Sequence, residues 1–519
     1  MGSASARQFE VESRQVMAPR PHRLSKSRFT AGLQCHRQLW WKVHEPRAAE
    51  LRPGAALQAV FDMGNRVGER ARQEFPNAVL INFDYRRPLA SVKPTRQAID
   101  AGASVILEAS FFEDDIFVAV DALSKEGDGW VLTEVKATTR VKPQHIPDAA
   151  VQAHVVEKAG LPVVRVELMH LNREHRHPNQ RPLFIRADIS AEVAAHRGDI
   201  AGEAGAQMQM LAGELPHVEP GPHCTSPYDC PFLDRCVAPA PDHLIEELNG
   251  IRANKLGELR EAGIETVDQI PSDFPLEPLW ARHRAAVLRK QLIVEPGLRE
   301  VLASYRYPIA MLDFETVGPA LPVWNGCSPF GAVPVQFSVH TVHEDGEVSH
   351  SAYLAEGPGD PRPGVAEALI QALDGAETVL AWHASVEKRC LGQLAKACPE
   401  RAPALLEARN KTEDLLVVVK NHLYHPDFRG SFSIKNVVLS LLPDMAYDEL
   451  DVADGQIASS LLERLLCRPE ELSQGEGEAL QTQLTAYCDH DTAVMVELLG
   501  VLRSSGTRSP PTSPVVSST

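Results

Sequence analysis

Two runs rich in β-branched and aromatic residues flank the turn-forming cluster at 126–129, and together they predict an antiparallel hairpin over residues 116–139. A turn centred on this cluster places Asp121 opposite Glu134. Because strand side chains alternate between faces, Glu134 and Lys136 share one face. Two facing carboxylates repel unless a cation lies between them. The patch therefore predicts a site for a hard divalent ion, Mg²⁺ or Mn²⁺, with the lysine orienting a water or an anionic oxygen.

The alternative interpretation is a solvated hairpin face that carries an ordinary Glu–Lys pair. The residues of the opposite face are apolar, which favours a packed sheet instead: they are Val118, Val120, Val131 and Val135. Downstream, Gln152 lies in the helix-like segment VQAHVVEKAGL, which precedes the strand-like segment VVRVELMHL.

This order of elements resembles the PD-(D/E)xK nuclease core of the RecB-like exonucleases. The resemblance implies roles for four residues: metal binding by Asp121 and Glu134, assistance to the attacking water by Lys136, and support of the site by Gln152. It also implies a first motif on an upstream helix, where GNRVGERARQEF supplies Glu69 as a metal ligand. Gly68 occupies the place where many relatives have histidine.

The composition is that of an ordinary globular protein of two to four domains, with 519 residues, 44% hydrophobic and 23% charged. The net charge of −17 does not exclude a nucleic acid, because phosphate binding depends on local patches such as the basic, aromatic segment 20–42. Neither a membrane-spanning run nor a signal-like start is present, so we expect a cytoplasmic protein without a membrane partner. Residues 1–22 and 504–519 are predicted to be disordered tails.

Nine cysteines in such a chain are expected to be mostly reduced thiols, and the five in the C-terminal half are read as small core residues. The remaining four are one distant residue and a tight trio: Cys35, Cys224, Cys230 and Cys236. This arrangement is similar to the one that holds a [4Fe–4S] cluster in the RecB-like nucleases of CRISPR adaptation and in the AddB-type helicase–nucleases, although the usual spacing there begins C-x2-C. Thiolates also suit structural Zn²⁺, and unliganded cysteines are the third interpretation.

A second set of residues suited to chemistry lies in the C-terminal half. YPIAMLDFETVG reads as a buried strand whose i, i+2 spacing puts Asp313 and Glu315 on one face. Two further strands follow, and a fourth runs into an amphipathic helix with Glu387 in its first turn. Near the end of the chain, Tyr487 and Asp491 lie four residues apart on one helical face.

Taken singly these motifs are weak, because a helical YxxxD more often reflects a core tyrosine and a solvated aspartate. The ordered set resembles the tyrosine subclass of the DEDD exonucleases, which have a ribonuclease H-like fold. The resemblance implies that Tyr487 orients the nucleophilic water and that two metal ions are held by four acids: Asp313, Glu315, Glu387 and Asp491. Glu387 stands where the family usually has aspartate.

Between the two halves, residues 243–271 resemble a helix–hairpin–helix. Gly250 would present backbone N–H groups to a phosphate, with Arg252 and Lys255 as further nucleic-acid contacts. A plain helical linker is the alternative, because a short glycine-containing turn alone does not establish phosphate binding.

The expected fold is α/β multidomain: a PD-(D/E)xK restriction-endonuclease-like core, a small helical hairpin region and a ribonuclease H-like α/β domain. The expected boundaries are a tail at 1–22, the RecB-like nuclease domain with its Fe–S cluster at 23–240, the linker at 241–300, the DEDD exonuclease-like domain at 301–503 and a tail at 504–519. Across 23–503 the chain resembles bacterial proteins that join an iron–sulfur RecB-like nuclease to an otherwise uncharacterised C-terminal domain. LSKSRFTAGLQCHRQLWW, CTSPYDCPFLDRC, LDFET and FRGSFSIKNVVLSLLP carry that likeness.

The expected function is that of a metal-dependent nuclease that hydrolyses phosphodiester bonds of DNA at a RecB-like site and trims 3′ ends at a second site, in repair, recombination or defence. One alternative is a nucleic-acid-binding scaffold in which one or both sites are inactive. Another is an exonuclease directed at RNA, since nothing in the sequence reads the 2′-hydroxyl. The sequence leaves protein partners, oligomeric state and the role of Lys435 open.

Overall fold

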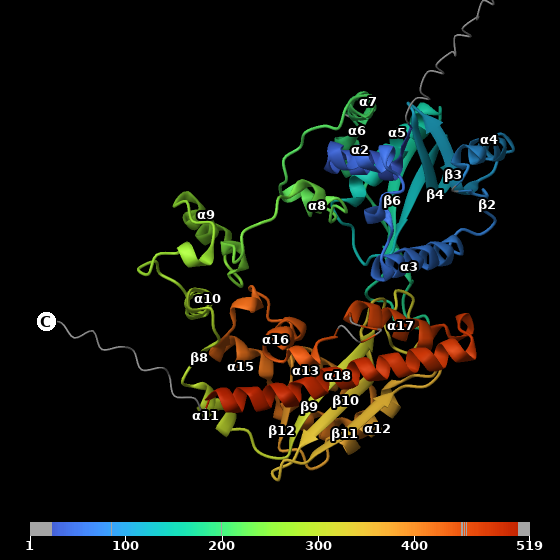
Figure 1. Ribbon diagram of the computed structural model, residues 1–519. Helices are drawn as coiled ribbons and strands as arrows, with labels where there is room; N and C mark the ends of the chain where they lie inside the picture. The colour runs from blue at the N-terminus through green and yellow to red at the C-terminus, as the bar shows by residue number, and fades with distance from the viewer. Residues whose placement is uncertain are drawn as a thin grey trace, which may run out of the picture.

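The computed structural model describes residues 23–506 except 85, 199, 448–449, 451 and 453. Most of both expected tails lies outside the described residues, but the last helix continues to Gly506, so the predicted tail boundary at 504 is wrong. Figure 1 shows two α/β units, one coloured blue to green and the other yellow to red, with a small helical region beside them. The expected α/β multidomain class is confirmed at this level.

A seven-stranded sheet forms the centre of the N-terminal unit, in the order β2-β3-β4-β5-β6-β7 with β1 beside β4. Its strands are β1 (Leu24–Ser25), β2 (Val79–Leu80), β3 (Val105–Glu113), β4 (Ile116–Glu126), β5 (Gly129–Lys136), β6 (Val163–Leu171) and β7 (Phe184–Asp188). Strand β4 runs antiparallel to both of its neighbours, β3 and β5, whereas β6 runs parallel to β5.

The hairpin predicted at 116–139 is confirmed as β4 and β5. Glu126 pairs with Gly129 around a two-residue turn in which Gly127 has φ 58°, a conformation that glycine adopts without strain. The register continues to Ala122 and Thr133, so the next facing pair is Asp121 and Glu134, as the sequence predicts. The valines expected on the opposite face are fully or almost fully buried, except Val135, which is half-buried.

Helices cover both faces of this sheet (Figure 1). They are α1 (Lys26–Gln34), α2 (His36–His44), α3 (Ala55–Arg72), α4 (Val92–Asp100), α5 (His145–Lys158), α6 (Ser190–Arg197), α7 (Ile200–Leu211) and the short α8 (Leu233–Cys236). Helix α5 is apolar on several sides because it is buried between the sheet and helices α1, α6 and α7. Helix α3 packs Val67 and Ala71 against Leu107 and Ala122 on the other face.

The linking region contains η4 (Ile245–Glu247), α9 (Ala253–Glu261), η5 (Val267–Gln269) and α10 (Pro278–Arg289) around a small core that includes Leu259 and Trp280. The first helix expected for a helix–hairpin–helix is wrong, because only the three-residue 3-10 helix η4 precedes the turn at Gly250. The backbone at Leu244 is extended because it forms an isolated β-bridge with Thr266.

A five-stranded sheet forms the C-terminal unit, in the order β11-β10-β9-β12-β13. Its strands are β9 (Ile309–Val317), β10 (Val333–Val342), β11 (Val348–Leu354), β12 (Thr378–Ala381) and β13 (Thr412–Asp414), while β8 (Ile293–Val294) and β14 (Leu423–Tyr424) form a separate pair. Strand β10 is antiparallel to β9 and β11, whereas β12 and β13 continue parallel to β9.

The helices of this unit are α11 (Leu298–Ala303), α12 (Arg362–Ala372), α13 (Ser385–Ala397), α14 (Ala402–Lys411), α15 (Leu415–His422), α16 (Ile434–Leu441), α17 (Gly455–Cys467) and α18 (Gln474–Gly506). Alternation along β9 sends Leu312 and Phe314 toward α12, α13 and α14. Ile309 and Met311 point to the other face, which the long helix α18 crosses. In the described part of the chain, no helix combines the length and apolarity that a membrane span requires.

The glycine at 430 allows the linking region to approach the C-terminal unit. Gly430 has φ 78° and its carbonyl accepts a hydrogen bond of 2.8 Å from Asn249 Nδ2, while an added Cβ would lie 1.9 Å from the Glu247 carbonyl oxygen. We expect Gly430→Ala to lower the free energy of unfolding by about 1–2 kcal/mol for the left-handed backbone, plus the cost of displacing that contact.

The matched control is Gly346→Ala, since Gly346 also has a positive φ of 90° but nothing within 4 Å of an added Cβ. Urea denaturation followed by tryptophan fluorescence measures both variants, and Trp280 reports directly because its Nε1 donates to Asn249 O. Equal losses in the two variants would show that the close approach contributes nothing.

Candidate functional site

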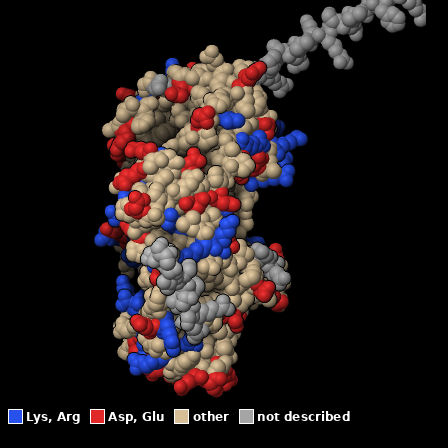
Figure 2. Space-filling model, turned by 60° about the vertical axis from the view of Figure 1, so that its left-hand side comes forward, with Lys and Arg blue, Asp and Glu red and all other residues tan. Residues whose placement is uncertain are grey.

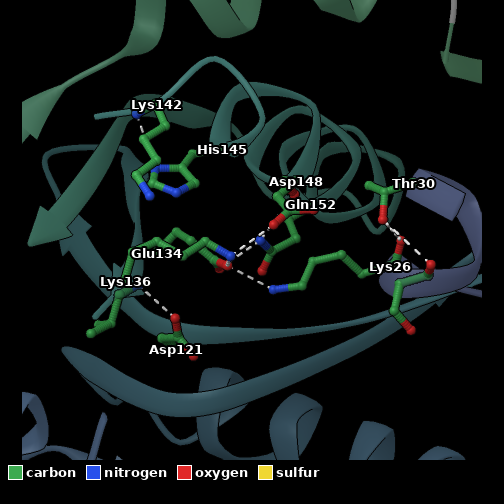
Figure 3. A network of polar contacts seen from close by, with 11 residues as sticks. Lys26, Thr30, Asp121, Glu134, Lys136, Lys142, His145, Asp148 and Gln152 are labelled. Carbon is green, nitrogen blue, oxygen red and sulfur yellow. Dashed lines mark hydrogen bonds and ion pairs between the residues drawn. The ribbon is translucent and has the colours of Figure 1, made fainter. Parts of the chain in front are cut away.

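The first cluster of polar side chains lies where β5 meets α5. Glu134 on β5 is 1% exposed, and its Oε1 lies 2.9 Å from the ammonium of Lys136, two residues along the same strand. That ammonium is also 2.7 Å from Asp148 Oδ2 of α5, one turn before Gln152. Gln152 is completely buried and donates from Nε2 to Glu134 Oε2 at 2.7 Å. Figure 3 shows these side chains converging, so three predicted residues meet at one point.

Lys26 completes this cluster, and sequence reasoning missed it. Its ammonium lies 2.8 Å from Glu134 Oε1, from the first turn of α1, which begins there because Ser25 Oγ accepts a hydrogen bond from the Arg28 N–H. Burial disfavours the Lys26 ammonium, but the neighbouring carboxylates, with Glu134 as the strongest, together outweigh that cost and raise its pKa. The signal was the basic segment 20–42, which the sequence assigns only generally to a nucleic-acid groove or an anchored helix.

The pKa values of Asp121 and Glu134 are shifted in opposite directions. Burial and then the charge of Glu134 raise the pKa of Asp121 to about 7, although its Oδ2 accepts a 2.6 Å hydrogen bond from the Val135 N–H. Burial opposes the charge of Glu134 as well, but Lys136 and Lys26 outweigh it and hold the pKa of Glu134 well below its usual range. Of these two carboxylates, Asp121 is therefore the one whose charged form is disfavoured in the fold.

A third acid lies next to Asp121. The β3–β4 register pairs Leu107 with Ala122 and Ala109 with Val120, which puts Glu108 opposite Asp121. Glu108 and Asp121 line one small cavity, and Glu108 forms a 2.7 Å ion pair with Arg72 of α3. The signal for Glu108 was present in the sequence, because a two-residue turn at 114–115 pairs Glu113 with Ile116 and, counted back along both strands, Glu108 with Asp121.

The structure does not bring Glu69 to this cavity. Gly68 lines it, whereas Glu69 is exposed on α3. Gly68 stands where many RecB-like nucleases have histidine, and it lines the same cavity as the two acids. An added Cβ at Gly68 would meet nothing within 4 Å.

The four cysteines singled out in the sequence meet around one small cavity. Cys35 lies between α1 and α2, Cys224 and Cys230 lie in the loop before α8, and Cys236 ends α8. The Cys230 N–H donates to the Cys224 carbonyl at 2.8 Å, which folds this loop on itself. Burial raises the pKa of the Cys230 thiol, and so do Cys35 and Cys224 nearby. The arrangement joins the beginning and the end of the N-terminal unit at a set of soft ligands.

The second carboxylate cluster lies between β9 and α18. Asp313, Glu315 and Asp491 each have a carboxylate oxygen within 4.8 Å of the others. Burial raises the pKa of Asp313 well above its ordinary value, with Asp491 and Glu315 as the next causes. Burial and the charge of Asp491 raise the pKa of Glu315 to about 8, and burial raises that of Asp491 to about 6. Repulsion among three carboxylates held this closely favours a cation between them.

Glu387 lies beside this trio, in the first turn of α13 as predicted. It is 3% exposed, and its Oε2 has no hydrogen-bond partner among the described residues. Burial raises its pKa to about 8, and its charge in turn raises the pKa of Asp313 and Glu315. A buried carboxylate oxygen without a partner is available to a ligand.

Two tyrosines and a lysine surround Asp491. Tyr487 is 5% exposed, but Tyr447 is the tyrosine whose hydroxyl donates to Asp491 Oδ1. The Lys435 ammonium lies 5.3 Å from the Tyr447 ring and 5.5 Å from the Tyr487 ring, and it lowers the pKa of Glu315 and Asp491. Sequence reasoning missed Tyr447, which no local pattern marked. It singled out the segment that contains Lys435 but gave this residue no role.

The nucleic-acid contacts predicted in the linking region lie apart from a helical hairpin. Gly250 is exposed with φ 74°, and the exposed Arg252 directly precedes α9. The Lys255 ammonium is already engaged, at 2.8 Å from Glu258 Oε2 and 4.8 Å from the Phe274 ring. In the described structure, these three residues do not form a phosphate-binding nest.

Residues 310–433 match a family described as a domain of unknown function (DUF2779). The matched segment contains Asp313, Glu315 and Glu387 and ends before Asp491. Among curated proteins, none matches the chain.

The raised pKa values predict how stability depends on pH when no divalent ion is present. An acid whose pKa is higher in the folded than in the unfolded state contributes stability at low pH that is lost as pH rises through the folded value. With Glu315 and Glu387 at about 8, the free energy of unfolding should fall between pH 5 and pH 8. Asp313→Asn removes one charge from the cluster and should flatten this slope, raising the unfolding temperature at pH 8 by about 2–4 °C per kcal/mol gained.

Thermal unfolding in divalent-ion-free buffer checks this, with the exposed Asp374→Asn as the matched control. Added Mg²⁺ should stabilise the wild type more than Asp313→Asn. Identical slopes in the wild type and Asp313→Asn would contradict the electrostatic account of the cluster.

Proposed function

We propose that this protein is a metal-dependent nuclease that hydrolyses phosphodiester bonds of DNA, in repair, recombination or defence. It would have a RecB-like site within residues 23–240 and a DEDD 3′–5′ exonuclease-like site within 301–503. One observation carries the proposal: Asp313 and Glu315 of β9 meet the distant Asp491 of α18, with one carboxylate oxygen of each within 4.8 Å of the others. Asp491 is buried and the other two acids are half-buried. Carboxylate clusters of this kind are the ligands of the metal ions that assist phosphoryl transfer.

The arrangement of elements supports both finer fold assignments. In the N-terminal unit, α3 precedes the antiparallel strands β3, β4 and β5, and the glutamine-bearing α5 and β6 follow, in the order expected for a PD-(D/E)xK core. In the C-terminal unit, the acid-bearing β9 is the central strand, with antiparallel β10 and β11 on one side and parallel β12 and β13 on the other. This mixed sheet supports the ribonuclease H-like assignment.

At the first site, Asp121 and Glu134 would hold a divalent ion. When bound, the ion would polarise the phosphodiester and increase the acidity of a water molecule. Gln152 fixes the second oxygen of Glu134, and Asp148 holds the Lys136 ammonium beside that carboxylate. The pKa of Lys136 is raised by Glu134 and Asp148 despite its burial, so it would meet an anionic phosphate oxygen as a full positive charge.

At the second site, Asp313, Glu315, Asp491 and the neighbouring Glu387 would hold two ions. Tyr447 fixes the orientation of Asp491 by its hydrogen bond. Burial and the charge of Asp491 raise the pKa of Tyr487, which keeps its hydroxyl protonated and able to orient a water. The Lys435 ammonium offers a positive charge to the phosphate of a substrate strand.

The charge distribution is compatible with a polyanionic substrate in spite of the net charge of −17. Figure 2 shows Lys and Arg side chains in groups among acidic ones on one face, so the surface is not uniformly acidic. Phosphate binding depends on such local groups. RNA stays as the alternative substrate, since no described contact distinguishes a 2′-hydroxyl.

One observation favours a second candidate function for the first site, that of a binding site without cleavage. Glu134 Oε1 contacts both Lys26 and Lys136, and Oε2 accepts from Gln152, so both oxygens are already occupied by protein groups. An ion would have to displace at least one of these partners. If none gives way, the first site would position nucleic acid for the second.

The four cysteines would hold a [4Fe–4S] cluster. They line one cavity, and thiolates are the ligands that such clusters use. Four sulfur atoms around one zinc ion lie about 3.8 Å apart, from Zn–S bonds of about 2.3 Å. Among the described residues, no three of these sulfur atoms lie within 4.8 Å of one another. The wider spacing favours the larger cluster over the alternative, structural Zn²⁺.

Cleavage of end-labelled DNA and RNA in Mg²⁺ or Mn²⁺ tests the function. Lys136→Met removes the ammonium beside Glu134, and Asp313→Asn removes a central ligand of the second cluster. Each should lower the rate of one distinguishable product pattern by about 10²–10⁴-fold, the range for losing electrostatic or general acid–base assistance. Matched controls are Lys125→Met, an exposed lysine of the same hairpin, and Asp374→Asn.

If the double variant degrades single- and double-stranded substrates as fast as the wild type, the assignment is wrong. If only Asp313→Asn abolishes cleavage and Lys136→Met weakens binding alone, the first site is the binding site described above.

Anaerobic purification tests the cluster. We expect a brown protein with about four iron atoms per chain, and loss of most iron in Cys224→Ser because one thiolate ligand is removed. Cys467→Ser, which changes a cysteine outside the cavity, should keep the iron. Stoichiometric zinc without iron in the wild type would instead establish the zinc alternative.

A further inference from the structure

Two histidines and a glutamate meet in the linking region, away from both carboxylate clusters and from the cysteines. His243, Glu247 and His283 each place one ligand atom within 4.8 Å of the others. His243 precedes η4, Glu247 ends η4, and His283 lies in the middle of α10. His243 and Glu247 lie at the start of the segment that resembles a helix–hairpin–helix in sequence, and the fold brings them to His283 of α10.

His283 is the most informative member of this group. It is 1% exposed, and neither of its ring nitrogens has a hydrogen-bond partner among the described residues. Its ring stacks on Tyr424, with centroids 4.3 Å apart, so the imidazole is held in a fixed orientation. Burial, with His243 as a lesser cause, lowers its pKa to about 3. Buried imidazoles normally have a partner, and the neutral ring is the form that binds metals.

The two carboxylate oxygens of Glu247 have different surroundings. Its Oε1 accepts hydrogen bonds of 2.9 Å and 3.1 Å from the Arg429 guanidinium, which fixes the carboxylate. Its Oε2 is buried without a hydrogen-bond partner and faces His243 Nδ1 at 3.7 Å, too far for a hydrogen bond. His243 Nδ1 is likewise buried and unpartnered. The three side chains therefore each offer one ligand atom to one point, and the carboxylate oxygen and imidazole nitrogens named above are buried without hydrogen-bond partners.

From this geometry we propose that His243, Glu247 and His283 form a site for a divalent transition-metal ion, with Zn²⁺ as the best fit. Two neutral imidazoles and one carboxylate oxygen are a ligand set that Zn²⁺ accepts readily, with water as a fourth ligand. Mg²⁺ and Ca²⁺ prefer oxygen ligands and fit poorly. The pairing of Glu247 with Arg429 is the kind of outer contact that orients a metal-binding carboxylate.

The consequence of such an ion is structural. It would tie the start of the linking region to α10, and through Arg429 to the loop after η7 (Pro426–Phe428) of the C-terminal unit. Asn249 already bonds that loop at Gly430, so the ion would reinforce an existing contact. The inference does not depend on the proposed nuclease function, because neither carboxylate cluster nor the cysteine cavity contributes a ligand.

Zinc titration of the metal-stripped full-length protein tests the site. The cysteines and carboxylates also bind zinc, so the readout is the difference between variants in zinc per chain, measured by mass spectrometry of the metal after gel filtration. We expect the wild type to hold one more zinc than His243→Ala and Glu247→Gln. His217→Ala is the matched control, since His217 is 80% exposed and pairs only with the exposed Glu219; it should match the wild type.

Two further measurements keep the result interpretable. Metal-free thermal unfolding should be the same within about 1–2 °C in the wild type and His243→Ala, whereas added Zn²⁺ should raise the midpoint of the wild type more. Co²⁺ should give visible bands of a tetrahedral nitrogen–oxygen site that both ligand variants lose. If both ligand variants bind as many zinc ions as the wild type with the same affinity, or give the same Co²⁺ spectrum as the wild type, the site does not exist.

Discussion

The burial of carboxylates without enough positive charge to balance them is the constraint on which the rest of the structure depends. Asp121 lies on the middle strand of three, between Glu108 and Glu134, and Asp313 lies among Glu315, Glu387 and Asp491. Isolated charges placed this way would separate or take up protons. Hydrogen-bonded sheets and packed helices prevent separation, so the groups respond by a raised pKa instead. The raised pKa values are the reason for proposing that both carboxylate clusters bind a cation.

The two clusters relieve this repulsion differently. At the first, Lys26 and Lys136 bind Glu134 directly, and only Asp121 keeps a strongly raised pKa. At the second, Lys435 lowers the pKa of Glu315 and Asp491 from the side of the tyrosine rings. Glu315 and Glu387 still keep a pKa of about 8, and the pKa of Asp313 stays well above its ordinary value. The second cluster therefore has more to gain from a divalent ion. Under the proposed function, metal ions would therefore supply more of the positive charge at the second site than at the first.

Local rules predicted the hairpin, its register and the face shared by Glu134 and Lys136, because strand alternation and turn position are properties of adjacent residues. They also predicted Glu387 at a helix start, whereas the gathering of the four cysteines was expected only from the family resemblance. Lys26, Tyr447 and the role of Lys435 were missed, since each reaches its carboxylate only through packing of distant helices and loops. The expected first helix at 243–249 was wrong because a long-range bridge to Thr266 overrides local helix propensity.

The central claim is that both carboxylate clusters are divalent-ion sites. Binding of Mn²⁺ measured from the electron paramagnetic resonance signal of the free ion tests it most directly, with the wild type, Asp121→Asn and Asp313→Asn compared at pH 8. The account predicts that each variant loses a separate class of bound Mn²⁺, with the larger loss in Asp313→Asn. Unchanged Mn²⁺ binding in both variants would contradict it.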